Sequence, residues 1–427
     1  MNKHLLPTLL IAGMSLGTAW AIRGQFGHEQ GAAWAGGIGA LGIVLLAKRK
    51  DWYAKVFQLA LASAAGWGVT GIISYGIVVG YGRGIDFGNV YYGLSMLFVI
   101  GGLFGLLGGG LFGLVLSDRE DKPVLWHRLI VEMTIGGFIF YYLLIEELGW
   151  LMTPPRSEAW AACFGMSVAM FWYMIRHQHY SALRLAVFTG AGAAFGFAFG
   201  NFLQTVGTAS EIKFNFWNVM EYSIGFFGGI GMAYGTFTSE WPETAVNSNR
   251  NKFLAPLLIL TLIIPFIVWD QSFTTEKIVN TTKGFDHAAP AESIAVNTQW
   301  LSFLLILITA SYWLYHFYFK QKANETTIAY QDLYTFFLGH LGLYTIFSLL
   351  ITGAFISLYR IEQYLYIVNL VALAFLVGRY QPSFTNRGLN ISRWMINLLF
   401  ILIAIALMTV IAVSSHGEVN GAEHRFN

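Results

Sequence analysis

Polar side chains interrupt an otherwise apolar sequence near the N-terminus, in the stretch WAIRGQFGHEQGAAW. The forked donors of Arg23 suit a carboxylate, a phosphate or a cluster of hydroxyls. His28 or Glu29 could carry a proton beside it. The glycines between them allow a ligand to approach the backbone closely. The stretch therefore predicts a functional site in a re-entrant or broken helix that lines a cavity.

A second interpretation gives the same stretch no chemistry. In that interpretation Arg23 lies at the membrane interface and pairs with Glu29, and the pair only fixes the turn between two helices. The sequence leaves both interpretations open, and it leaves His28 undecided between a proton carrier and an interfacial residue.

Comparable polar residues stand at three further turns, where ionisable groups close to membrane hydrocarbon usually mark a site. We expect these turns to converge on one polar vestibule, with Arg83 and Asp86 as a pair that shapes it. One of the adjacent Glu146 and Glu147 should face the bundle, because neighbouring residues on a helix diverge by about 100°. The predicted solute-binding residues are Arg23, Gln25, His28, Glu29, Gln30, Arg83, Asp86, Asn89, Asn201 and Gln204. The predicted proton-coupling residues are Glu29, Glu146, Glu147 and Glu221.

The composition determines the class of protein that must position these residues. Of 427 residues, 56% are hydrophobic and 11% are charged, against about 25% charged in soluble domains. This predicts an all-α, polytopic membrane protein, since a transmembrane barrel would alternate over about ten residues. The net charge of +2 gives no indication of a nucleic-acid partner, and a single cysteine excludes an internal disulfide or a multi-cysteine metal site. No cofactor is expected, and the predicted partners are the lipid bilayer and a small solute.

Hydropathy predicts about thirteen transmembrane helices. Most lysines and arginines then fall on one side, which predicts a cytoplasmic N-terminus, an external C-terminus and a multi-pass protein of the inner (cytoplasmic) membrane. The polar turns would lie on the outer face. The expected spans are 5–22, 31–47, 56–79, 90–116, 128–148, 159–175, 183–203, 216–237, 253–269, 300–319, 333–357, 363–378 and 393–413.

Glycine divides the chain into two predicted regions. Residues 1–240 hold most of the 47 glycines and should form a tightly packed bundle of eight helices, because small residues let membrane helices approach closely. Residues 241–427 should form a looser five-helix region with an external loop at 270–299. Helices within 300–413 would then serve a homo-oligomer or a partner subunit.

Helix hairpins within residues 1–240 show signs of repetition. The stretch YGIVVGYGRGIDFGNVYYG from Tyr75 and the one from Phe195 share an aromatic-Gly-x-x-x-Gly pattern before the turn and Phe-x-Asn-Val after it. Such repeats would be parallel, and solute sites of transporters commonly lie between repeats.

The function predicted from these features is a secondary transporter of a small polar solute, a sugar or an organic anion, coupled to protons. Arg23 would contact the solute, and Glu29 or the Glu146/Glu147 pair would carry the proton. One alternative is a membrane-embedded enzyme that acts at the outer face on a lipid-linked or glycan substrate, with His28 and Glu29 as acid and base. The other is a non-catalytic membrane subunit.

Overall fold

Helices make up all the regular structure of the part of the chain that the computed structural model describes. That part comprises residues 4–210, 212–243, 250–285, 289–320, 328–386, 388, 390–417 and 419–426. Nine of its helical segments are long and apolar enough to cross a membrane, and α4 and α16 are apolar but shorter. A helix lies within each range expected from hydropathy. A helical, membrane-type bundle is therefore confirmed.

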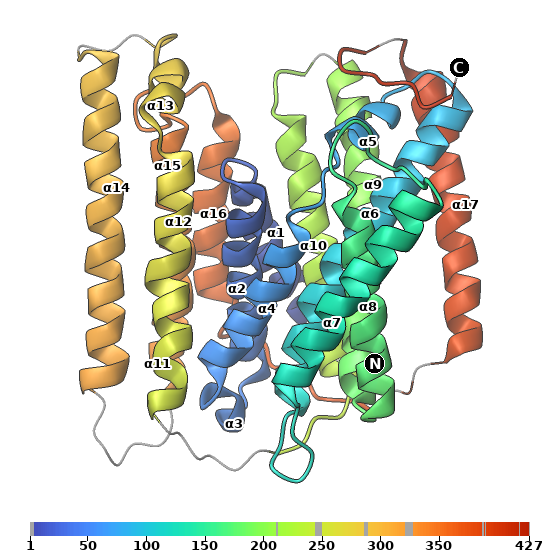
Figure 1. The fold of residues 1–427 in the computed structure, drawn as a ribbon. Coiled ribbons are helices and arrows are strands. Elements are labelled where there is room, and N and C mark those ends of the chain that lie inside the picture. The colour runs from blue at the N-terminus through green and yellow to red at the C-terminus, as the bar shows by residue number, and fades with distance from the viewer. Residues whose placement is uncertain are drawn as a thin grey trace.

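Most helices run between two ends of the bundle, which we call the upper and lower ends as they stand in Figure 1. The helices up to residue 240 are α1 (Leu5–Arg23), α2 (His28–Ala47), α3 (Lys50–Tyr53), α4 (Val56–Thr70), α5 (Gly76–Tyr81), α6 (Phe87–Ser117), α7 (Trp126–Tyr141) with a π-helical turn (Tyr142–Glu147), α8 (Ala159–Arg176), α9 (Tyr180–Ala209) and α10 (Phe216–Phe237). The later helices are α11 (Arg250–Leu258), a π-helical turn (Ile259–Ile263), α12 (Ile264–Ser272), α13 (Thr275–Thr282), α14 (Ala291–Leu314) with a π-helical turn (Tyr315–Lys320), α15 (Tyr330–Ile351), α16 (Ile361–Leu376) and α17 (Ile391–Ser415).

Six helices of the first region close into a ring. Following the contacts, α1 packs on α2, α2 on α4, α4 on α6, α6 on α9, α9 on α10, and α10 on α1. The ring thus consists of three successive hairpins, α1–α2, α4–α6 and α9–α10, each of which turns at the upper end (Figure 1). The fourth hairpin, α7–α8, packs outside it. Repeated hairpins would produce this arrangement, and their duplication stays a prediction.

Aromatic side chains fill the middle of the ring. The Trp67 side chain of α4 fits among glycines of three other helices: a Cβ at Gly36 would lie 2.6 Å from it, one at Gly228 would lie 3.1 Å away, and one at Gly108 would overlap its indole nitrogen. Trp20 contacts Trp67 edge-on at 4.8 Å between ring centroids and Phe104 at 5.5 Å. We call Trp20, Trp67 and Phe104 the aromatic floor; all three are fully buried.

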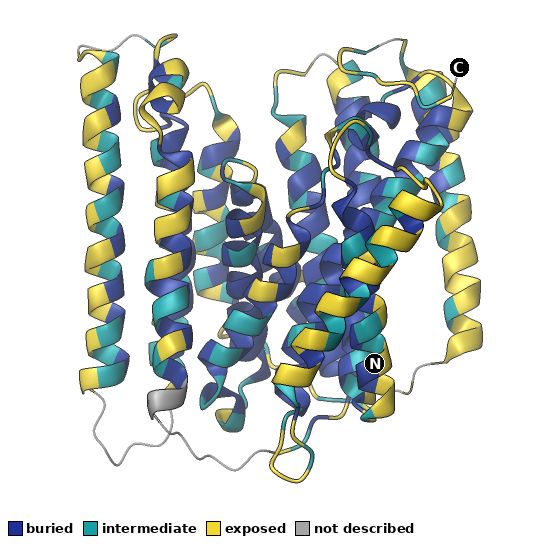
Figure 2. Cartoon of the chain, viewed as in Figure 1, coloured by how far each residue is buried: buried dark blue, intermediate teal, exposed yellow. Residues whose placement is uncertain are grey.

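The second region does not form one block. Helices α11, α12, α15 and α16 pack against α1, α2 and α4, whereas α17 packs on α6 and α9, on the far side of the ring (Figure 1). Much of α14 and α17 is exposed, as the yellow ribbon in Figure 2 shows. These are surfaces that lipid or another protein would cover.

Two sequence predictions about continuity are wrong. The expected span 56–79 is broken, because α4 ends at Thr70 and α5 begins only at Gly76. The expected loop 270–299 is partly helical, since it contains α13 and the start of α14. At the break, a Cβ on Gly71 would lie 2.5 Å from the carbonyl oxygen of His28, so the chain passes directly against the start of α2.

A buried histidine at the lower end makes stability depend on pH. His179 is 3% exposed, and its Nδ1 lies 3.1 Å from the hydroxyl of Ser117. Burial, helped by nearby Lys122, lowers the pKa of His179 from its ordinary 6.5 to about 4. The unfolded chain therefore binds the proton first as pH falls, and the stability contributed by neutral His179 should be lost between pH 6.5 and about 4. Melting temperatures across this range should fall less for His179→Gln than for the wild type; equal slopes would contradict the prediction.

Candidate functional site

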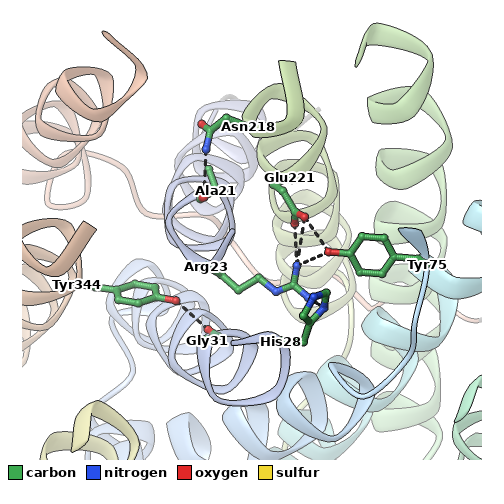
Figure 3. A network of polar contacts seen from close by, with 8 residues as sticks. All are labelled: Ala21, Arg23, His28, Gly31, Tyr75, Asn218, Glu221 and Tyr344. Atoms are coloured by element: carbon green, nitrogen blue, oxygen red, sulfur yellow. Dashed lines mark hydrogen bonds and ion pairs between the residues drawn. The ribbon is translucent and has the colours of Figure 1, made fainter. Parts of the chain in front are cut away.

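A charged network lies inside the ring, with residues from each of the three hairpins that form it (Figure 3). Arg23 ends α1, and its guanidinium points inward rather than toward the surface, with its side chain 2% exposed. Nη1 donates to the hydroxyl of Tyr75 at 2.7 Å and to the carboxylate of Glu221 at 3.0 and 3.2 Å. Arg23, Tyr75 and Glu221 come from the first, second and third hairpins respectively.

The Arg23–Glu221 ion pair is deeply buried, since the Glu221 side chain is only 6% exposed. Such a pair is held by its two charges together, because either charge alone would be costly in this environment. The guanidinium carbon of Arg23 also lies 5.1 Å from the ring centroid of Trp20, in cation–π range. The network therefore contacts the aromatic floor directly, through Arg23 and Trp20.

Tyr75 connects the two charges. Its hydroxyl accepts from Arg23 and donates to Glu221 Oε1 at 2.9 Å. The break between α4 and α5 brings this side chain to the ring interior, where it packs edge-on against Phe197 at 5.1 Å. The hydroxyl thus adds a second link between the guanidinium and the carboxylate.

His28 forms the open side of the network. It is the first residue of α2, and its Nδ1 lies 3.1 Å from Nη2 of Arg23. Arginine is always a donor, so Nδ1 must accept, which makes His28 neutral here with its proton on Nε2. The residue is exposed, unlike Arg23 and Glu221.

Neighbouring residues hold the α1–α2 turn in place around this network. Asn218 of α10 donates to the carbonyl of Ala21 at 3.2 Å, and Tyr344 of α15 donates to that of Gly31 at 3.0 Å (Figure 3). The ring of Tyr344 stacks on Trp34 at 4.4 Å. One helix of the second region thus supports the site directly.

The rest of the first turn lies outside the network. Glu29 is exposed, and within the described residues Arg23 forms its ion pair with Glu221, so the second interpretation, in which Arg23 pairs with Glu29, is wrong. Lys277 Nζ donates to the carbonyl of Gln25 at 2.8 Å, which brings α13 over the turn. Gln30 is buried and folds back against Gly27, where a Cβ would overlap its carboxamide.

Asn201 and Gln204 form a second buried group next to α5. Asn201 Nδ2 donates to Gln204 Oε1 at 3.1 Å and to the carbonyl of Val79 at 3.4 Å. Asn201 Oδ1 and Gln204 Nε2 are buried without a hydrogen-bond partner among the described residues. A Cβ on Gly82 would overlap Asn201 Oδ1. This group fixes α5, the helix that follows Tyr75.

The second turn is not organised around an Arg83–Asp86 pair. Asp86 caps α6, accepting from the backbone of Asn89 at 2.8 Å and from its side chain at 2.6 Å. Burial alone would raise the pKa of Asp86, but these hydrogen bonds outweigh it and lower the pKa. Arg83 instead donates to the carbonyl of Asn420 at 3.3 Å and lies over the ring of Trp217.

Glu146 and Glu147 do not face the ring. Both are exposed, so the prediction that one of them faces the bundle is wrong. Two structural causes account for this: the residues lie in a π-helical turn, and the α7–α8 hairpin packs outside the ring. Of the predicted site residues, Arg23, His28 and Glu221 therefore come together in the network, whereas Glu146 and Glu147 stand apart from it.

Sequence reasoning missed Tyr75, Asn218 and Tyr344. Tyr75 is one of 21 tyrosines, and no local pattern separates it from the others. Its closeness to the Gly-rich repeat was the available signal, but the role of its hydroxyl depends on a glutamate 146 residues away. The described residues contain no group of three or more histidine, cysteine or carboxylate side chains that could hold a metal ion.

Comparisons with known proteins add no further assignment. No protein-family model, curated protein or solved structure matches this chain. Function must therefore be inferred from the chemistry of the network. An arginine whose Nε has no partner among the described residues, a carboxylate, a bridging hydroxyl and a neutral imidazole can together bind an anion and exchange a proton.

Proposed function

We propose that this protein is a secondary carrier that moves a small organic anion together with protons across the inner (cytoplasmic) membrane. The buried Arg23–Glu221 ion pair is the observation that carries the proposal. In this proposal the chain crosses the bilayer thirteen times, with its N-terminus in the cytoplasm and the upper end outside, as the distribution of lysine and arginine predicts.

We expect solute and proton transport to be coupled because the solute and Glu221 compete for the same cation, Arg23. A solute carboxylate and Glu221 would both be attracted to Arg23, but two buried anions on a single arginine leave one negative charge uncompensated. The solute therefore binds when Glu221 takes up a proton and releases the guanidinium. Each anion then enters the site together with a proton, and the site keeps the same net charge whether empty or loaded.

Alternating access has a physical basis in the same region. The aromatic floor closes the ring below the network, while His28 opens toward the upper end. Carriers commonly place their sites at interrupted helices, and the break between α4 and α5 supplies Tyr75. Displacement of Tyr75 would remove the hydroxyl that bridges the two charges and would leave only their direct contact to be opened.

Purified protein in liposomes with an internal pH dye tests the proposal. Lactate, succinate and glucuronate serve as anionic probes, and glucose serves as the neutral probe. We expect at least one anion to acidify the interior when it is supplied outside, and glucose to have no effect. No proton movement with any of the anions would overturn the proposal, and turnover of an added lipid-linked substrate would favour the membrane enzyme instead.

Substitutions should separate binding from coupling. Glu221→Gln should retain exchange of labelled solute but lose accumulation driven by a pH gradient, because its amide cannot take up the proton. Arg23→Lys should weaken solute binding by about tenfold to a hundredfold, since the bidentate donors are lost. Glu120→Gln, in an exposed loop, is the matched control and should behave as wild type. Proton-driven uptake by Glu221→Gln at the wild-type level would contradict this mechanism.

A further inference from the structure

The last described residues of the chain fold back over the upper end of α5 and α6. We call residues 419–426 the strap. Asn89, which is 1% exposed, holds it: Oδ1 accepts from the backbone nitrogens of Arg425 and Phe426 at 2.5 and 2.9 Å, and Nδ2 donates to the carbonyl of Phe426 at 3.2 Å. The single carboxamide of Asn89 thus bonds to two consecutive backbone N–H groups and to the carbonyl of the second of these residues.

Main-chain contacts continue along the strap. The backbone nitrogen of Glu423 donates to the carbonyl of Gly80 at 3.1 Å, and Arg83 donates to the carbonyl of Asn420. The side chain of Arg425 donates to the carbonyl of Leu151 at 2.9 Å. A Cβ on Gly80 would overlap the Glu423 side chain, so α5 has a glycine where the strap passes.

The strap buries little side-chain surface. Its residues are half-buried or exposed, and Phe426 remains 50% exposed while its ring packs edge-on against Tyr92 at 5.4 Å. A segment held by backbone hydrogen bonds, with few buried apolar contacts, opens far more readily than the core. Release would remove both hydrogen bonds that the buried Asn89 Oδ1 accepts from the strap. Asn89 Nδ2 would keep its bond to Asp86 and lose its bond to Phe426.

We propose that the upper end of α5 and α6 is a binding site for a short peptide segment, which the strap occupies reversibly. A peptide group supplies both the donors and the acceptor that Asn89 requires, whereas a simple anion or cation would satisfy only one side of the carboxamide. An aromatic residue at the position of Phe426 packs on Tyr92, and an arginine before it reaches Leu151. The proposal holds whether or not the protein is a carrier.

Limited trypsin digestion of the full chain tests whether the strap is bound to Asn89 and α5. Cleavage after Arg425 is measured by mass spectrometry relative to cleavage after Arg119, which lies in an exposed loop. We expect Gly80→Ala to accelerate cleavage after Arg425 at least tenfold. Gly76→Ala is the matched control on the same helix, since a Cβ there meets nothing within 4 Å, and it should leave the rate unchanged. Cleavage after the buried Arg184 would reveal general unfolding, which the prediction excludes.

A synthetic peptide of residues 419–426 tests exchange. Excess peptide should displace the strap of the wild-type protein and accelerate hydrogen exchange at the backbone amides of Arg425 and Phe426 severalfold, measured without trypsin because the peptide is itself a trypsin substrate. The same peptide with a methyl group on the Phe426 amide nitrogen should have no effect, because Asn89 loses that donor. The proposal is overturned if the wild type is cut after Arg425 as fast as after Arg119, if the unmodified peptide has no effect, or if the methylated peptide acts equally well.

Discussion

Replacing Glu221 with leucine is expected to destabilise the folded protein by about 3–5 kcal/mol, because Arg23 would remain buried with no opposite charge. The double variant Arg23→Met/Glu221→Leu removes both charges and should lie within about 1–2 kcal/mol of wild type. Unfolding free energies from denaturant titration in mixed micelles, followed by tryptophan fluorescence, measure both effects.

The matched control for this prediction is Glu120→Leu, which removes an exposed carboxylate and should have little effect. Coupling between the two sites is obtained from the double-variant cycle. If the losses of Arg23→Met and Glu221→Leu simply add, the two charges do not stabilise one another and the ion pair is not the centre of the site.

The close contact between α9 and α10 depends on two glycines. Replacing either of them should lower the stability of the folded protein, and this is the second largest effect that we expect. A Cβ on Gly192 would overlap the carbonyl oxygen of Phe227, and one on Gly231 would overlap that of Phe188. Backbone lies on both sides of these contacts and cannot turn aside as a side chain can. Gly192→Ala or Gly231→Ala should therefore cost about 3 kcal/mol, at the upper end of the range for overpacking.

Thermal unfolding and monodispersity on a sizing column measure this loss. Gly102→Ala is the matched control, because its Cβ would lie 3.7 Å from that of Ala194, in ordinary contact across the α6–α9 interface. It should change the melting temperature by no more than a few degrees. Equal melting temperatures for all three variants would mean that the ring is looser than this packing implies.

Hydropathy and glycine content were sufficient to predict the class of fold. Apolar runs place the helices because each run must satisfy its backbone internally, and glycines indicate which helices approach closely. The break before Tyr75 was not predictable in this way, since Gly71 lies against the backbone of α2 and not against a local neighbour. Hydropathy read the whole range 56–79 as one helix for that reason.

The site was predictable in its residue types and only partly in its pairing. Arg23, His28 and Glu221 were candidates because charged groups are rare in apolar sequence. The carboxylate that neutralises Arg23 is 198 residues away, however, and the nearer Glu29 was the natural choice from sequence alone. The prediction for Glu146 and Glu147 assumed a regular helix facing inward, which the π-helical turn and the outer position of their hairpin do not provide.

The division of the network among three hairpins constrains the order in which the protein can be assembled. Arg23 leaves the ribosome first, Tyr75 follows, and Glu221 is made last. Until the third hairpin is synthesised, Arg23 has no buried carboxylate to pair with and must keep its charge in the hydrated interface. Synthesis of α10 supplies the missing carboxylate and the helix that contacts both α1 and α9, so the ring can close only after the third hairpin is made.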